Sequence, residues 1–282
     1  MNSILVATDL SKENKILLDR ALEIASKTKS ELHILHVLYV VRFEPNDDIF
    51  LIEEKKCRKW IEKYIEKSGH KNDVPFKIHI ADGGHIHEQI DLYMNHLQPH
   101  MALIGQSSQN RDAPDFILST VENLILQSSY PVLIIPNNKP DNDYNSISIY
   151  AEKPDAVVQM LNILVPYTGN KIETIHVFLD EYFRMQRFIF RLHRKYLERA
   201  YMNVKQSIET LLERYNLRQK IKIEQHREQR LQNLFTHINK EQMRAIAIEI
   251  PNYALNDDEI DSGLRKVLSN SKCELLILGD TK

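Results

Sequence analysis

The fold of this chain is decided by a stretch that reads Ala102-Leu103-Ile104-Gly105-Gln106-Ser107-Ser108, then Leu118-Ser119-Thr120-Val121-Glu122, then Pro131-Val132-Leu133-Ile134-Ile135-Pro136. The first segment is typical of a buried strand that ends in a turn at Gly105, and the third of a second apolar strand that Pro131 opens. Ser119 or Thr120 is a candidate N-cap for a helix between them. A strand that leads through a loop to a helix N-terminus suits an anion, because free backbone N–H groups and the helix dipole point at the loop.

Apolar strands and amphipathic helices alternate through the first half of the sequence. The periodicity predicts strands at residues 4–7, 31–37, 76–81, 101–104 and 132–135. It predicts helices at residues 15–26, 51–68, 86–95 and 120–127. Strands separated by helices are typical of parallel βα units, whose crossover connections are right-handed.

The same succession returns after residues 138–145, a polar segment with a proline that we predict to be a linker. The pattern predicts strands at residues 147–150, 171–179, 220–225, 245–250 and 274–278, and helices at residues 153–164, 183–215, 230–238 and 257–269. Two local sequence similarities support a tandem repeat. Residues 31–37 are similar to residues 172–177, and residues 102–105 are similar to residues 245–249. We therefore predict an α/β protein of two domains, residues 1–137 and 146–282. Each is expected to contain a parallel sheet of about five strands.

Composition limits the classes of function. The chain has 282 residues, of which 43% are hydrophobic, and a formal net charge of −2. This charge gives no general affinity for nucleic acid or membrane surfaces, and no window approaches the roughly 18 apolar residues of a membrane span. The two cysteines, Cys57 and Cys273, match no motif spacing, and the sequence opens with strand-like residues rather than a signal peptide. We therefore expect a cytoplasmic protein that binds neither nucleic acid nor membrane.

The first half resembles a domain of the universal stress protein family. The family pattern of Gly-x-x-Gly, nine residues and Gly-Ser or Gly-Thr is matched in spacing by Gly105, Ser108 and the pair Leu118-Ser119. Residues 4–11 resemble the opening strand with its aspartate, residues 81–86 the glycine turn after the third strand, and residues 129–133 the entry to the fifth strand. The second half resembles the family only in layout. The resemblance implies a nucleotide-binding, alpha-hydrolase-like fold for both halves. Each would be an open, doubly wound sheet of five parallel strands in the order three-two-one-four-five, with any nucleotide at the carboxyl ends of strands one and four.

The resemblance also implies a nucleotide pocket in the first half. Its candidate residues are Asp9, Gly105, Ser108, Ser119 and Thr120. Ser108 and Leu118 replace family glycines, and the loss of glycine weakens ATP binding because the backbone must approach a phosphate without a Cβ. Asp9 has a second interpretation as a turn or helix-capping residue. In the second half Glu249 replaces the strand-four glycine, where a carboxylate repels phosphate.

Two further polar clusters have structural as well as functional interpretations. His79, His85 and His87 near Asp82 have a spacing found in metal sites, but a solvated histidine turn also accounts for it, and we predict no metal site. One stripe of the predicted helix at residues 183–215 is basic. It contains Arg184, Arg187, Arg191, Arg194, Lys195 and Arg199. This stripe suits an anionic partner, or it is a solvated face opposite a core stripe.

The sequence contains no nucleophile elbow, P-loop or recognisable Cys–His pair, so we predict no catalytic residues. The resemblance therefore favours a non-enzymatic universal stress protein that acts in the stress response by binding or regulation. The alternative is a sensor of adenine nucleotides, ATP or AMP, that uses the first domain and hydrolyses ATP slowly. A third interpretation is a module for another small ligand or metal in the same crevice. The family also implies that the domains pair through their fifth strands, residues 132–135 and 274–278, and that the chain can form a homodimer.

Overall fold

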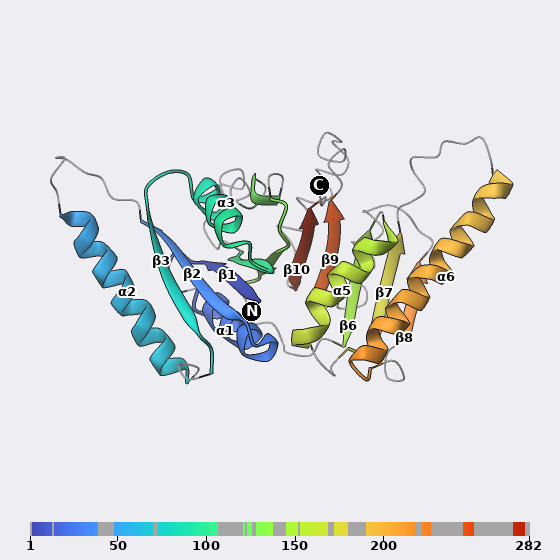
Figure 1. Cartoon of the computed structure of the whole chain (residues 1–282), viewed down its shortest axis with the longest axis horizontal. Helices are drawn as coiled ribbons and strands as arrows, with labels where there is room; N and C mark the ends of the chain where they lie inside the picture. The colour runs from blue at the N-terminus through green and yellow to red at the C-terminus, as the bar shows by residue number, and fades with distance from the viewer. Residues whose placement is uncertain are drawn as a thin grey trace. The chain divides into compact units, whose positions relative to one another are not determined.

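The chain is described from a computed structural model. The residues that it describes are 2–12, 14–38, 48–69, 73–106, 121, 123–125, 128–137, 145–151, 153–168, 172–179, 190–217, 222–226, 245–250 and 273–279. The chain divides into two compact units, Met1–Lys139 and Pro140–Asp280. Each unit contains both strands and helices (Figure 1).

The first unit is a parallel sheet with helices between its strands. Its strands are β1 (Ser3–Ala7), β2 (Glu31–Leu38), β3 (Phe76–Asp82), β4 (Met101–Gly105) and β5 (Val132–Ile135). Its helices in the described residues include α1 (Asn14–Thr28), α2 (Ile49–Ser68) and α3 (Ile86–Leu97). The strands lie in the order β3-β2-β1-β4-β5, and every neighbouring pair is parallel. This order confirms the three-two-one-four-five prediction for the first half.

The helices of the first unit bury unequal faces. Helix α1 packs on β1, β2 and β4, and α2 packs on β2 and β3. The buried apolar residues of α1 are Leu17, Leu18, Ala21, Leu22, Ile24 and Ala25. In α2 only Ile61 and Ile65 are buried, and the aromatic residues Trp60 and Tyr64 in its second half are half-buried. Because right-handed crossovers place α1 and α2 on the same face of the sheet, these aromatic rings lie beside α1 rather than in the core.

The second unit repeats this architecture. Its strands are β6 (Ser146–Ala151), β7 (Thr174–Leu179), β8 (Lys222–His226), β9 (Ala245–Ile250) and β10 (Glu274–Gly279). Helix α5 (Pro154–Thr168) follows β6, and α6 (Phe190–Arg214) follows β7. The strands lie in the order β8-β7-β6-β9-β10 with parallel pairing throughout. The second half therefore also has the predicted order.

Strand register identifies equivalent positions in the two units. Ile4 of β1 lies opposite Met101, the first residue of β4. Ile147 of β6 lies opposite Ala245, the first residue of β9. Counted from these starts, the fifth residue is Gly105 in β4 and Glu249 in β9. The prediction that Glu249 replaces the strand-four glycine is thus confirmed by the register.

Some predicted boundaries are wrong. Strand β7 begins at Thr174 rather than at residue 171. Helix α5 continues to Thr168, past Pro166, rather than ending at residue 164. The Thr168 hydroxyl donates to the Leu164 carbonyl at 2.8 Å, and Tyr167 is buried, so packing and a side-chain hydrogen bond sustain the last turn. The predicted helices at 230–238 and 257–269, half of 120–127 and residues 183–189 lie outside the described residues.

None of the described helices is both long enough and apolar enough to cross a bilayer.

Candidate functional site

In the first unit the carboxyl ends of β1 and β4 lie next to each other, because the two strands are parallel neighbours. Ligands of open parallel sheets bind at the carboxyl ends where the strand order reverses. The strand order reverses at β1, because its two neighbours in the sheet, β2 and β4, lie on opposite sides of it. β1 leads through Thr8 to Asp9, and β4 ends at Gly105. The fold therefore brings Asp9 and Gly105 to the same edge of the sheet.

Asp9 organises the turn between β1 and α1. Its Oδ1 accepts a hydrogen bond from the Ser11 backbone N–H at 2.8 Å and another from the Asn14 side-chain amide. The Ser11 hydroxyl oxygen accepts the Asn14 backbone N–H at 3.3 Å. The contact between Asp9 and Ser11 is an Asx turn, and it is Ser11 that accepts the N–H of the first residue of α1. These contacts agree with the interpretation of Asp9 as a turn residue.

The electrostatic state of Asp9 follows from the same contacts. Partial burial raises the pKa of Asp9, but hydrogen bonds from Ser11 and Asn14 and the nearby His36 lower it by more, so that it lies below its ordinary value. The His36 Nδ1 in turn lies 2.8 Å from the Thr8 carbonyl oxygen. Asp9 is exposed, so its ionised carboxylate can accept hydrogen bonds from hydroxyl or amino groups of a ligand.

Gly105 provides room for the first residue of α1. A Cβ at Gly105 would lie 2.6 Å from Asn14 Oδ1 and 3.6 Å from Leu17 Cδ2. The first distance is too short for real Cβ atoms, so the Asn14 side chain can take its position only because residue 105 is glycine. Asn14 therefore contacts both predicted site residues, Asp9 and Gly105. Sequence analysis missed it, although an amide three residues after Ser11 at a helix start is a recognisable capping pattern.

The remaining candidate residues of the first-unit pocket are Ser108, Ser119 and Thr120. They lie outside the described residues, as does the glycine replacement Leu118. The pocket is therefore described only at the ends of β1 and β4.

In the second unit a carboxylate lies at the equivalent edge. Glu249 is 5% exposed, and its Oε2 accepts the Lys153 backbone N–H at 3.0 Å. Lys153 directly precedes α5, which begins at Pro154. The first N–H groups of a helix attract anions, and proline at the first helical position lacks an N–H of its own. The Glu249 carboxylate thus accepts one backbone N–H at the turn where an anionic ligand of this unit would bind.

The predicted histidine cluster is divided in the structure. His79 Nε2 lies 2.9 Å from His33 Nδ1, which joins β2 and β3, and His33 Nε2 lies 3.1 Å from Glu31 Oε2. The exposed His85 instead stacks on His87 with ring centroids 5.6 Å apart. Among the residues that the structure describes, no group of three or more His, Cys, Asp or Glu side chains is placed to hold a metal ion.

The predicted basic stripe is only partly described. Arg199 is exposed on α6. Arg184 and Arg187 lie outside the described residues.

Comparison with known proteins agrees with this geometry. Residues 1–136 match the model of the Universal stress protein family. No curated protein matches the chain. A universal stress protein from Archaeoglobus fulgidus DSM 4304 is 14% identical with a TM-score of 0.66, over 99% of this chain and 98% of its own. A functionally unknown protein, PA1789 from Pseudomonas aeruginosa PAO1, is 16% identical with a TM-score of 0.59, over 100% of this chain and 93% of its own.

A third solved structure covers about one unit. It is the universal stress protein from Archaeoglobus fulgidus in complex with dAMP, 22% identical with a TM-score of 0.37, over 48% of this chain and 97% of its own. The two structures that span both units share the α/β fold of the chain, and the family model covers the unit that carries Asp9 and Gly105. Residues 1–136 therefore form a domain of the universal stress protein family.

Proposed function

We propose that this chain is a non-enzymatic protein of the stress response that acts in the cytoplasm by binding and regulation. We propose further that its second unit binds no nucleotide. The observation that carries this proposal is the position of Glu249, whose buried carboxylate accepts the Lys153 N–H at the start of α5. A phosphate about 4 Å from a carboxylate meets a repulsion of about 4 kcal/mol at a surface-like dielectric. Family membership supports the stress-response assignment.

Calorimetric titration of the full chain with ATP, with and without Mg²⁺, tests this proposal. We expect no saturable binding at micromolar concentrations, because the sequence places Ser108 and Leu118 where the family has glycines. The double variant Ser108→Gly, Leu118→Gly is expected to raise the affinity. Ser107→Gly, which adds a glycine outside the family spacing, is the matched control and is expected to leave the affinity unchanged.

A second candidate function is a sensor of adenine nucleotides in the first unit. The observation that favours it is the exposed carboxylate of Asp9 at the carboxyl end of β1, beside the bare backbone of Gly105. ATP binding at micromolar concentration or below, lost in Asp9→Ala, would replace the first proposal with this one. Slow release of ADP from the same samples would add hydrolysis to the sensor function.

Pairing of sheet edges is proposed as the structural role of the second unit. Among the described strands of each unit, β5 pairs with β4 alone, and β10 pairs with β9 alone. Open edges of parallel strands invite pairing with other strands. We therefore propose that β5 and β10 cover each other in the chain, and that two chains can associate further as a homodimer.

A further inference from the structure

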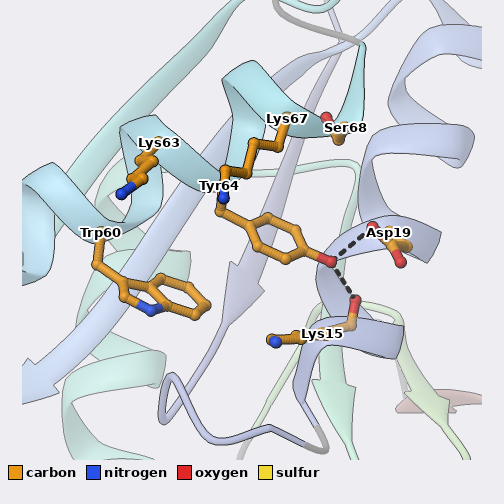
Figure 2. A pocket seen from close by; sticks show the side chains of 7 residues that line it. All are labelled: Lys15, Asp19, Trp60, Lys63, Tyr64, Lys67 and Ser68. Atoms are coloured by element: carbon orange, nitrogen blue, oxygen red, sulfur yellow. Dashed lines mark hydrogen bonds between the residues drawn. The ribbon is translucent and has the colours of Figure 1, made fainter.

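A surface cavity of about 550 Å³ lies between α1 and α2 of the first unit. Its lining residues come from the first two turns of α1 and the last three turns of α2. They are Lys15, Asp19, Trp60, Lys63, Tyr64, Lys67 and Ser68 (Figure 2). A volume of this size is typical of small-molecule sites. None of these residues belongs to the site at the strand ends.

One wall of the cavity is aromatic and fixed in place. The rings of Trp60 and Tyr64 are nearly parallel, with centroids 5.3 Å apart and an interplanar angle of 9°. The Tyr64 hydroxyl donates to Asp19 Oδ1 at 2.7 Å and lies 3.2 Å from the Lys15 carbonyl oxygen. Figure 2 shows both rings projecting from α2 toward α1. The ring of Tyr64 is therefore held across the space between the two helices.

The rim of the cavity is positively charged. Lys15, Lys63 and Lys67 are all exposed, and within the described part of the chain no carboxylate lies within salt-bridge distance of their ammonium groups. Asp19 is the one carboxylate in the lining, and it already accepts the Tyr64 hydroxyl. The lining therefore contains three positive side chains and one negative side chain, and the negative one already accepts a hydrogen bond from Tyr64. This excess of positive charge attracts anions.

The combination of rings and lysines selects the class of ligand. An aromatic wall alone would also suit an organic cation, because the face of an indole attracts positive charge. Three ammonium groups repel such a cation, whereas they attract a carboxylate, sulfate or phosphate group. We propose that the cavity between α1 and α2 binds a small anion that carries a flat aromatic ring. The ring lies against Trp60 and Tyr64, and the lysines receive the anionic group.

Trp60 provides a reporter for this site, because it is the only tryptophan in the chain. Its indole N–H gives a single tryptophan side-chain signal in a ¹⁵N–¹H correlation spectrum of the full-length protein. We expect titration with 2-naphthyl phosphate to shift this signal saturably. Inorganic phosphate, which lacks the ring, and 2-naphthol, which lacks the charge, are each expected to produce little shift over the same concentrations.

Lysine variants test the charge requirement. Lys63→Gln, Lys67→Gln is expected to weaken 2-naphthyl phosphate binding about tenfold, since two surface cations are removed. Lys59→Gln is the matched control, because Lys59 is exposed on the same helix but outside the cavity lining, and it is expected to leave the affinity unchanged.

Three results would overturn the proposal. The first is an unchanged Trp60 signal at millimolar 2-naphthyl phosphate. The second is binding of 2-naphthol as tight as that of the phosphate. The third is an equal loss of affinity in Lys59→Gln and the double variant, which would indicate diffuse attraction to the charged helix. None of these results depends on ATP binding at the strand ends.

Discussion

At the scale of single residues, Asn14 connects two positions that the family pattern brings to the same sheet edge. Its amide donates to Asp9, and its Oδ1 lies where a Cβ on residue 105 would need space. Gly105→Ala should displace Asn14 and cost about 1 kcal/mol of unfolding free energy. In an Asn14→Ala background the same change should be neutral or stabilising, because alanine restricts the unfolded chain more than glycine does. Urea unfolding of the four proteins in this double-mutant cycle measures the coupling. Equal effects of Gly105→Ala in both backgrounds would contradict it.

Another residue-scale prediction concerns pH. Burial of its ring lowers the pKa of His79 from 6.5 to about 4, and neighbouring positive side chains add to the effect. The unfolded chain therefore takes up a proton at this residue below about pH 6.5, whereas the folded chain does so only near pH 4. Its contribution to stability is present above pH 6.5 and is lost as the pH falls toward 4. Because His79 is only half-buried, we expect a loss of about 1 kcal/mol.

The measurement is urea unfolding between pH 7 and pH 4. The variant His79→Gln should lose less stability over this range than the natural chain. His85→Gln, which alters an exposed histidine in the following turn, should behave like the natural chain. A pH dependence that is unchanged in His79→Gln would show that this histidine does not contribute.

At the scale of elements, the succession of strands and helices could be predicted from sequence because apolar strands and amphipathic helices have different periods. The order of the strands in each sheet followed instead from the family resemblance. The position of Glu249 could also be predicted, since it depends only on counting along β9. The end of α5 could not, because the helix is sustained past Pro166 by tertiary packing of Tyr167. The cavity between α1 and α2 was missed for the same reason. Trp60 and Tyr64 have the spacing of core residues, and only the contact of Tyr64 with Asp19 places them beside α1.

The start of α5 gives a prediction for an element. Glu249→Ala leaves the Lys153 N–H without the carboxylate that accepts it, and the loss of this partly buried hydrogen bond is expected to cost about 1 kcal/mol. Glu249→Gln keeps an oxygen acceptor but loses the charge, so it should cost less. Amide hydrogen exchange at Lys153 should accelerate strongly in Glu249→Ala and weakly in Glu249→Gln. Equal acceleration in the two variants would mean that charge rather than the hydrogen bond stabilises this turn.

At the scale of the whole molecule, the side of β5 that faces away from β4 is the edge that we propose the second unit covers. In the parallel ladder between β4 and β5, Pro131 accepts the Ala102 N–H at 2.9 Å and Ile135 accepts the Gln106 N–H at 2.8 Å. Backbone groups of alternate residues in a strand point to opposite sides, so Val132 and Ile134 direct theirs away from β4. The side chains of β5 are buried and apolar, which makes its outer edge a template for another strand.

Truncation after Asn145 tests whether the second unit covers that edge. The truncated chain should form dimers or aggregates, because β5 lacks the partner that we propose for it. Light scattering coupled to gel filtration measures the state, and circular dichroism checks that the domain is folded. The control is the truncated chain with Val132→Pro, which removes an N–H that points outward while sparing the ladder to β4. Proline should shift the folded domain toward monomer. A truncated chain that stays monomeric at high concentration without this substitution would show that β5 needs no cover, and the second unit would then require another role.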